Sequence, residues 1–217
     1  MSKALNVAVC QINPTLGNFQ KNIDIISKNY KYAVEKGADL VVFPEMSITG
    51  YPPQDLLNNK EFISQNISCL NELAKSTTIP CIFGYVDFED NKKFNAAAVC
   101  QDGEIVYKYH KIHLPNYDVF DERRYFHSGD SIGIFDLKVN NSDYKIALQI
   151  CEDLWEDEYE RKISKEIIEN NPDLIINISA SPFAKDRKND RIKLIQRKYK
   201  DANCPFIYCN LVGGQDE

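Results

Sequence analysis

The chain has 217 residues, which suits one large domain with a substantial hydrophobic core. Its 26 lysines and arginines against 32 aspartates and glutamates give a net charge of −6 without a basic block, which argues against nucleic acid or an anionic membrane as a partner. The first apolar run is too short for a signal peptide and no later run approaches a membrane span, so we expect a cytoplasmic protein.

The amino-terminal part predicts two parallel strands. Leu5–Cys10 has the composition of a strand, a helix follows between a cap at Asn18 and Gly37, and Asp39–Phe43 forms a second short strand. A strand–helix–strand unit of this length places both strands parallel in one sheet. Glu45 follows directly, at the edge where open α/β sheets place their sites.

The loop after Glu45 contains Gly50 and Pro52-Pro53, which we expect to prevent regular structure until a helix with Phe62 and Leu70 on its buried face begins. A loop glutamate is most often a solvated surface charge. Glu45, however, lies between an apolar strand and a constrained loop, and this context favours a fixed position for its carboxylate.

Three strand-like runs follow, at 81–88, 94–100 and 104–111. Asp102-Gly103 is a strong signal for a tight hairpin, so this part predicts an antiparallel meander and a mixed sheet. Lys111 ends the third run and enters a loop crowded with aromatic and charged residues. Such a lysine is usually a solvated charge, but among carboxylates it would be a fixed cation for an oxyanion.

The second half alternates strands and helices. We expect a strand at 134–139, a buried strand at 146–150, a charged helix at 156–171, a strand at 173–179, one more helix, and a strand at 205–212. The inner faces of the two helices are predicted from apolar residues at helical spacing: Ile163, Ile167 and Ile168 in the first, and Ile192, Ile195, Tyr199 and Ala202 in the second.

Cys151 stands at the end of the buried strand 146–150. A cysteine there lies at the sheet edge, beside free backbone N–H groups that favour a thiolate. A cysteine taken at random is more often structural, and the seven cysteines show no pattern of a disulfide framework or a zinc site. However, Glu45, Lys111 and the segment around Ser181 also follow strands, and their convergence at one edge would make a site.

Four motifs carry a resemblance to a known family: FPEMSITGYPPQDLL, YHKIHLPNYDVFDERRYF, ALQICEDLWED and NISASPF. Together they resemble the nitrilase (carbon-nitrogen hydrolase) superfamily with its Glu/Lys/Cys triad. The first two and SASPF with NLVGGQDE narrow the resemblance to the amino-terminal glutaminase domains of glutamine-dependent NAD synthetases. The resemblance implies a four-layer αββα sandwich of two mixed sheets, with residues 1–217 forming one glutamine amidohydrolase domain that is incomplete at its carboxyl end.

The resemblance also assigns catalytic roles. A thiol with a reference pKa of about 8.5 needs a base to become a nucleophile. By analogy Cys151 is the nucleophile, Glu45 is the general base, and Lys111 with the backbone N–H after Cys151 stabilises the oxyanion. Glu122 matches a second glutamate that orients the lysine and the substrate. The expected intermediate is a glutamyl thioester.

L-Glutamine is the substrate that the resemblance implies. Tyr117 and Ser181 match positions that hold the main-chain groups of the amino acid. Arg187 stands at a position where the family usually has lysine, and Asp186 at one where it usually has glycine. The α-carboxylate of glutamine would therefore be bound by Arg187 or by the neighbouring Arg191. Two residues close to the nucleophile complete the expected pocket: Glu152 and Trp155.

The chain has no SGGxDS loop like that of an ATP-pyrophosphatase domain. We therefore expect no cofactor or metal for this domain. ATP, magnesium and deamido-NAD would belong to a synthetase domain outside this sequence, which would receive the ammonia, and the full-length protein is expected to be a homo-oligomer.

Three alternatives stay open. A papain-like Cys/His site would use His110, His113 or His127, although His110 and His113 point to opposite faces if both lie on a strand. A free-standing amidase would act on another ω-amide or a carbamoyl compound. A non-catalytic α/β scaffold would only bind partners, and its Cys151 would be no more reactive than free cysteine.

Overall fold

The computed structural model describes residues 4–214 and contains two mixed sheets. Their strand orders are β1-β2-β3-β4-β5 and β6-β7-β8-β9. The strands are β1 Val7–Val9, β2 Leu40–Val42, β3 Cys81–Glu89, β4 Lys92–Gln101, β5 Glu104–His110, β6 Gly133–Val139, β7 Ser142–Ile150, β8 Leu174–Ser179 and β9 Phe206–Asn210.

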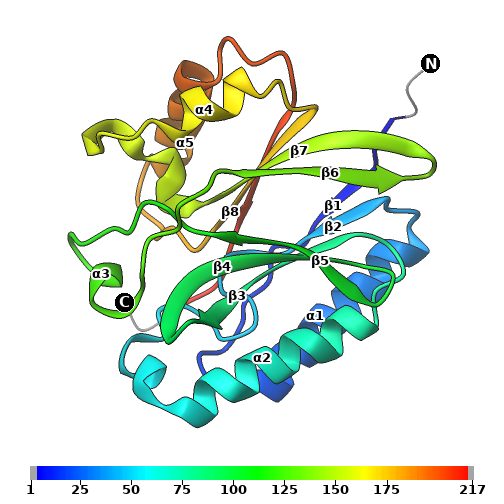
Figure 1. Ribbon diagram of the computed structural model, residues 1–217, viewed down its shortest axis with the longest axis vertical. Helices are drawn as coiled ribbons and strands as arrows, with labels where there is room; N and C mark the ends of the chain where they lie inside the picture. The colour runs from blue at the N-terminus through cyan, green and yellow to red at the C-terminus, as the bar shows by residue number, and fades with distance from the viewer. Residues whose placement is uncertain (1–3, 215–217) are drawn as a thin grey trace.

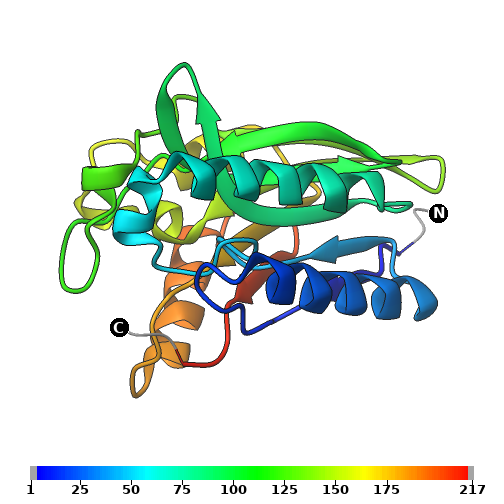
Figure 2. The ribbon, with the colours of Figure 1, turned by 90° about the horizontal axis from the view of Figure 1, so that it is seen from below.

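The helices form the two outer layers. Figures 1 and 2 show α1 and α2 lying side by side over the first sheet, with α4 and α5 on the other side of the molecule, over the second sheet. The α-helices are α1 Phe19–Glu35, α2 Lys60–Lys75, α3 Glu122–Tyr125, α4 Ile163–Glu169 and α5 Arg187–Lys198; the 3-10 helices are η1 Gln54–Asn58, η2 Cys151–Leu154 and η3 Glu156–Glu158. The expected four-layer sandwich is confirmed.

The first sheet combines a parallel and an antiparallel half, as the sequence predicts. β1, β2 and β3 are parallel, and β3, β4 and β5 form an antiparallel meander. Asp102 and Gly103 have φ angles of 51° and 85°, the left-handed conformation that a tight primed turn requires. The dipeptide turns the chain from β4 into β5, and the register then shifts at a bulge between Val99 and Cys100 before β5 ends at His110.

Helix α1 begins and ends at the residues that the sequence predicts. The Asn18 side chain accepts from the Lys21 backbone N–H at 3.2 Å, which satisfies one free donor of the first turn. Gly37 adopts φ 77° just after the helix, where a side chain would be strained. Ile26 and Tyr30 lie on the buried face and fix the helix against the sheet.

The loop after Glu45 is irregular only at its start. The 3-10 helix η1 begins at Gln54, immediately after Pro53, so the expectation that the two prolines prevent regular structure throughout the loop was wrong. Pro53 precedes this turn with φ −75° and ψ −19°, values that its ring allows.

The charged helix expected at 156–171 is also shorter than predicted. Residues 159–162 are irregular, because the Lys162 ammonium donates to the backbone carbonyls of Glu156, Asp157 and Tyr159 and holds the chain around itself. The Glu156 carboxylate then accepts from the Ser164 backbone N–H at 3.0 Å, at the start of α4. Hydrogen bonds from the Lys162 ammonium to backbone carbonyls have overridden helical spacing here, and of the three predicted isoleucines only Ile163 and Ile167 are fully buried.

The inner face of α5 also differs from the prediction. Ile192 is exposed, whereas Leu194 and Tyr199 are buried against the second sheet. The helix ends at Lys198, so Ala202 lies beyond it. Within residues 4–214, none of the helices has both the length and the apolar character that crossing a bilayer would need.

The layer between the sheets is apolar and continuous. Val42 and Val99 of the first sheet belong to the same buried cluster as Leu148 and Ile150 of the second. Such packing fixes one sheet against the other, so that groups at the ends of strands in different sheets keep a constant separation.

Candidate active site

Several reactive side chains lie just beyond strand ends. Glu45 follows β2, Lys111 follows β5 and Cys151 follows β7. Ser181 follows β8, which is parallel to β7, so the ends of these two strands share one edge of the second sheet. Loops from both sheets therefore supply groups to the same region.

Lys111 forms the centre of a buried ionic cluster. Its Nζ donates to Glu45 Oε1 and to Glu122 Oε1, each at 2.8 Å, and the Lys111 and Glu45 side chains are fully buried. Burial by itself lowers the pKa of the Lys111 ammonium, but the carboxylates of Glu122 and Glu45 raise it well above its ordinary value. The lysine is therefore a fixed positive charge away from water.

Glu45 is held by further donors. The amide of Asn95 on β4 donates to Glu45 Oε1 at 2.6 Å, and the backbone N–H of Ala180 donates to Oε2 at 2.7 Å. Gly84 on β3 allows the backbone to approach, because a Cβ there would lie 2.3 Å from the Pro44 carbonyl oxygen. The carboxylate is thus fixed from three directions, by elements of both sheets.

Glu122 stands at the start of α3 and faces the same lysine. It accepts from the Tyr51 hydroxyl at 2.9 Å through Oε1, and from the Asn95 amide at 3.4 Å through Oε2. Burial raises the pKa of Glu122, and the Lys111 ammonium opposes this effect. Asn95 and Lys111 therefore each bridge Glu45 and Glu122.

Cys151 opens the short helix η2 and is 5% exposed. Its φ of 43° is strained for a residue with a side chain and marks a sharp turn. Burial raises the pKa of the thiol well above its ordinary value, the Glu45 carboxylate adds to this effect, and the Lys111 ammonium opposes it. Burial and the Glu45 carboxylate thus favour the thiol form of Cys151, and the Lys111 ammonium favours the thiolate.

Three of the predicted substrate-binding residues gather around a recess of about 370 Å³. Tyr117 donates to Glu152 Oε2 at 2.9 Å, and Tyr159 donates to Oε1 at 3.2 Å. Burial raises the pKa of Glu152 to about 7. Trp155 lines the same recess, and the Arg187 guanidinium lies 5.3 Å from the centre of its ring.

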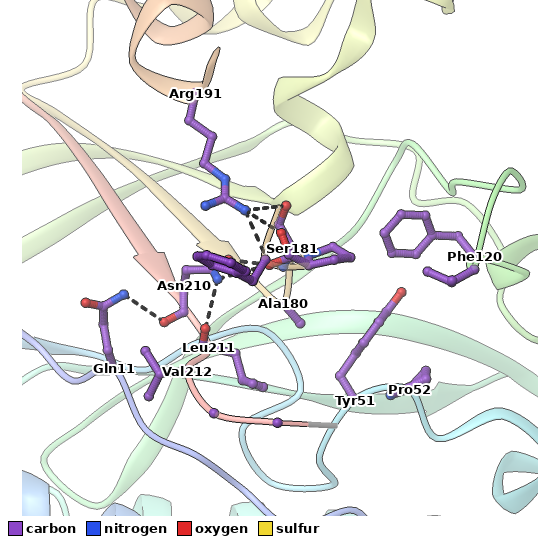
Figure 3. A pocket seen from close by; sticks show the side chains of 15 residues that line it. Gln11, Tyr51, Pro52, Phe120, Ala180, Ser181, Arg191, Asn210, Leu211 and Val212 are labelled. Atoms are coloured by element: carbon purple, nitrogen blue, oxygen red, sulfur yellow. Dashed lines mark hydrogen bonds between the residues drawn. The ribbon is translucent and has the colours of Figure 1, made fainter. Parts of the chain in front are cut away.

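Ser181 lines a different cavity, of about 570 Å³, which is drawn in Figure 3. Tyr51 and Ala180, which contact the two glutamates, also line it. Figure 3 shows Arg191 reaching toward Ser181 from α5, where it donates to Ser181 Oγ at 2.9 Å and to the Pro182 carbonyl at 3.1 Å. Arg187 does not line this cavity. The predicted binding residues therefore form two groups, which line two separate cavities, with Arg187 beside Trp155.

The histidines lie in other surroundings. His110 Nε2 is 2.9 Å from Asp87 Oδ2, and His113 Nε2 is 3.1 Å from the Arg161 carbonyl oxygen. His127 is exposed and lies beside the Phe94 ring. These positions give no support to a Cys151/His pair.

The outer face of the first sheet places three potential metal ligands together. Asp87, Glu89 and His110 each offer an atom within 4.8 Å of the others. However, the Lys108 ammonium already lies 3.1 Å from Asp87 and would repel a cation. The arrangement is that of an ion pair rather than a metal site.

Three groups that hold the two glutamates were not predicted from the sequence: the Asn95 amide, the Tyr51 hydroxyl and the Ala180 N–H. Asn95 had a signal, because it is a polar residue inside the apolar run 94–100. Gly84 had another, since an isolated glycine in a strand marks a close approach of backbone. The Ala180 N–H had none, because its contact with Glu45 depends on how the two sheets pack.

Comparison with known proteins identifies relatives over the whole chain. The family model for carbon-nitrogen hydrolases matches residues 6–217. The glutamine-dependent NAD(+) synthetase of Thermotoga maritima is 40% identical over 99% of this chain and 37% of that protein, and the one from Synechocystis sp. is 37% identical over 97% and 40%. The chain therefore spans about two fifths of the length of these relatives.

Solved structures agree with this similarity. The glutamine-dependent NAD+ synthetase of Acinetobacter baumannii superposes with a TM-score of 0.91 at 31% identity, over 99% of this chain and 40% of that one. An amidase from Nesterenkonia sp. superposes with a TM-score of 0.81 at 20% identity, over 97% of this chain and 77% of that one, and shares the fold.

Proposed function

The chain belongs to the carbon-nitrogen hydrolase family, and we propose that it hydrolyses the side-chain amide of L-glutamine with Cys151 as nucleophile. The observation that carries this proposal is the buried Lys111 held between Glu45 and Glu122 beside the Cys151 turn. An ammonium, a carboxylate base and a thiol in one dry place are the groups that amide hydrolysis through a thioester requires. The similarity to glutamine-dependent NAD(+) synthetases supports glutamine as the amide.

The first half of the reaction forms the acyl-enzyme. Glu45 takes the proton of the Cys151 thiol, and the sulfur attacks the amide carbon. The Lys111 ammonium and the backbone N–H of Glu152 stabilise the oxyanion of the tetrahedral intermediate. Glu45 then gives its proton to the leaving nitrogen, the C–N bond breaks, and ammonia departs from a glutamyl thioester.

The second half regenerates the thiol. Glu45 takes a proton from a water molecule, whose oxygen attacks the thioester carbon, and the same cation stabilises the second oxyanion. The C–S bond breaks, the sulfur regains the proton from Glu45, and glutamate leaves. Glu122 orients the Lys111 ammonium in both halves of the reaction, because it accepts a second hydrogen bond from this ammonium beside the one that Glu45 accepts.

The amino-acid end of glutamine would be held by residues of the two groups described above. Glu152, with Tyr117 beside it, accepts hydrogen bonds from the α-ammonium, and the family resemblance assigns Ser181, which lines the other cavity, to the main-chain groups. Arg187 grips the α-carboxylate, with Trp155 behind its guanidinium. Arg191 is the weaker candidate for this grip, because its Nη2 already donates to Ser181 and Pro182.

We further propose that the ammonia serves a synthetase domain of a longer, homo-oligomeric protein. That domain would use ATP and magnesium to amidate deamido-NAD. The relatives' name, glutamine-dependent NAD(+) synthetase, and their greater length support a further domain of this kind.

Ammonia release tests the proposed activity. The purified chain should release ammonia from L-glutamine faster than from asparagine, simple aliphatic amides or N-carbamoyl amino acids, and Cys151→Ala should abolish the release. A preference for another ω-amide or a carbamoyl compound would make the protein a different amidase. A Cys151 thiol that iodoacetamide alkylates no faster than free cysteine would contradict the nucleophile itself.

A further inference from the structure

Asp153 connects the segment that carries the thiol with the segment that carries the ammonium. It lies in η2, just after Cys151 and Glu152, and is fully buried. Its carboxylate accepts hydrogen bonds from both segments: Ile150 N at 2.9 Å and the Tyr109 hydroxyl at 2.7 Å on Oδ2, and Ile112 N at 3.1 Å and His113 N at 2.9 Å on Oδ1.

The donors flank the reactive residues. Ile150 immediately precedes Cys151, and Ile112 immediately follows Lys111. One carboxylate therefore fixes the backbone beside the thiol relative to the backbone beside the ammonium. These donors are buried, so each would lose its partner in a dry environment if the carboxylate were removed.

The turn at Cys151 needs this support because its φ of 43° is a strained conformation. The hydrogen bond from Ile150 N to Asp153 closes the turn across Cys151. The Gln149 amide braces it from the strand side by donating to the Asp153 carbonyl at 3.2 Å, and Tyr199 donates to Gln149 Oε1 at 2.8 Å. The strained residue is thus held from both sides.

We infer that Asp153 is a positioning residue that sets the Cys151 thiol against the Lys111 ammonium without touching the substrate. The inference rests on the proposed function, because only in that reaction do the thiol and the ammonium act on the same carbonyl group. Correct placement of the two groups would affect the chemical step far more than the affinity for glutamine.

The direct test is Asp153→Asn, which preserves the size of the side chain. The asparagine carbonyl can still accept from one pair of donors, but its NH₂ group cannot accept from the other pair. We expect kcat for ammonia release to fall about 10- to 100-fold, as for a small misplacement of reacting groups. KM for glutamine should change by less than about threefold, because the binding groups remain in place. The rate of alkylation of Cys151 by iodoacetamide should fall together with kcat.

Asp87→Asn is the matched control. Asp87 is also a buried aspartate with several polar contacts, but it lies on the outer face of the first sheet. The Asp87→Asn substitution should lower the melting temperature without changing kcat or the alkylation rate of Cys151. If a folded Asp153→Asn protein keeps wild-type kcat and alkylation, or loses no more activity than Asp87→Asn, the inference is wrong.

Tyr109→Phe provides a second test if Asp153→Asn does not fold. It removes one hydroxyl donor to Asp153 and leaves the carboxylate in place, so we expect a loss in kcat of about threefold at unchanged KM. An unchanged kcat would contradict the inference. The proposed function has its own test, because it is wrong if the wild-type protein releases no ammonia from glutamine. In that case the role of Asp153 would still be decided by comparing the alkylation rates of the wild type and Asp153→Asn.

Discussion

Two lysine–carboxylate clusters lie near the end of β5, on opposite faces of the first sheet. On the outer face Lys108 pairs with Asp87 at 3.1 Å, and the Lys108 side chain is 44% exposed. On the inner face Lys111 pairs with Glu45 and Glu122, and its side chain is fully buried. Lys108 lies within β5 and Lys111 lies just after its end, so the two ammonium groups belong to separate clusters although the lysines are close in sequence.

The two clusters contain the same chemical groups, lysine ammonium and carboxylate, but their different exposure to water suits them to different roles. Water reaches the outer cluster and screens it, so its ion pair adds little beyond local stability. The inner cluster sets two carboxylates around one ammonium away from water, where fixed charges act strongly on a reacting carbonyl group. A cluster suited to catalysis is thus distinguished by its burial and its excess of carboxylates, and the presence of a lysine is not sufficient.

The strongest test of this comparison exchanges each lysine for methionine. Lys111→Met leaves Glu45 and Glu122 without their cation, and we expect a loss of about 3–5 kcal/mol in the free energy of unfolding. Its kcat should fall by at least about 100-fold, because the oxyanion loses its main partner. Lys108→Met should cost less than about 1 kcal/mol and keep wild-type kcat. Urea unfolding measures the loss of stability, and ammonia release measures kcat. Equal effects of the two substitutions would contradict the difference between the inner and the outer cluster.

A smaller effect is expected from Asn95→Ala. The Asn95 amide donates to Glu45 and Glu122, so its loss should lower kcat about 10- to 100-fold, as for other residues that orient reactive groups. Asn66→Ala is the control, because Asn66 is also fully buried but binds the Val86 backbone on the outer side of the sheet. Both variants should lose stability. If Asn66→Ala loses as much kcat as Asn95→Ala, the role of Asn95 is structural.

The smallest effect should come from His110→Ala in the outer cluster. Burial raises the pKa of Asp87, but the hydrogen bonds from His110 and Lys108 lower it to about 2. An aspartate with a lowered pKa stabilises the folded protein above its ordinary pKa of 3.8, and this contribution is lost as the pH falls through about 2.

His110→Ala should therefore reduce the free energy of unfolding by about 1 kcal/mol at neutral pH, and by less once the pH falls below 3.8 toward about 2. Its kcat should equal that of wild type. A loss of activity as deep as that of Cys151→Ala, in His110→Ala or in His113→Ala, would instead support a Cys/His site.

Apolar runs in the sequence predicted the strands and the residues that follow them, whereas the two-sheet layering and the catalytic roles came from the family resemblance. Buried strands are visible as apolar runs, and the residues that follow them must lie at a sheet edge, so Glu45, Lys111 and Cys151 could be found without a structure. The supports of these residues come from other elements. Asn95 lies within a strand, and the Ala180 N–H meets Glu45 only because the two sheets pack face to face.

The errors in the helices have a similar origin. Spacing of isoleucines predicted one long helix at 156–171, but it could not show that the Lys162 ammonium would bind three backbone carbonyls and interrupt it. In α5 the isoleucine at 192 fits the helical period and is nevertheless exposed, because Leu194 and Tyr199 pack against the second sheet.

The central claim is that Cys151 forms a covalent intermediate with the help of Glu45. Intact-mass measurement of wild-type protein that is acid-quenched during turnover of L-glutamine tests it most directly, because acid stops hydrolysis of the thioester. A glutamyl adduct on Cys151 is predicted for the wild type, is absent from Cys151→Ala, and forms much more slowly in Glu45→Gln because that variant lacks the base for acylation. Continued release of ammonia with no adduct, or an adduct on another residue, would contradict it.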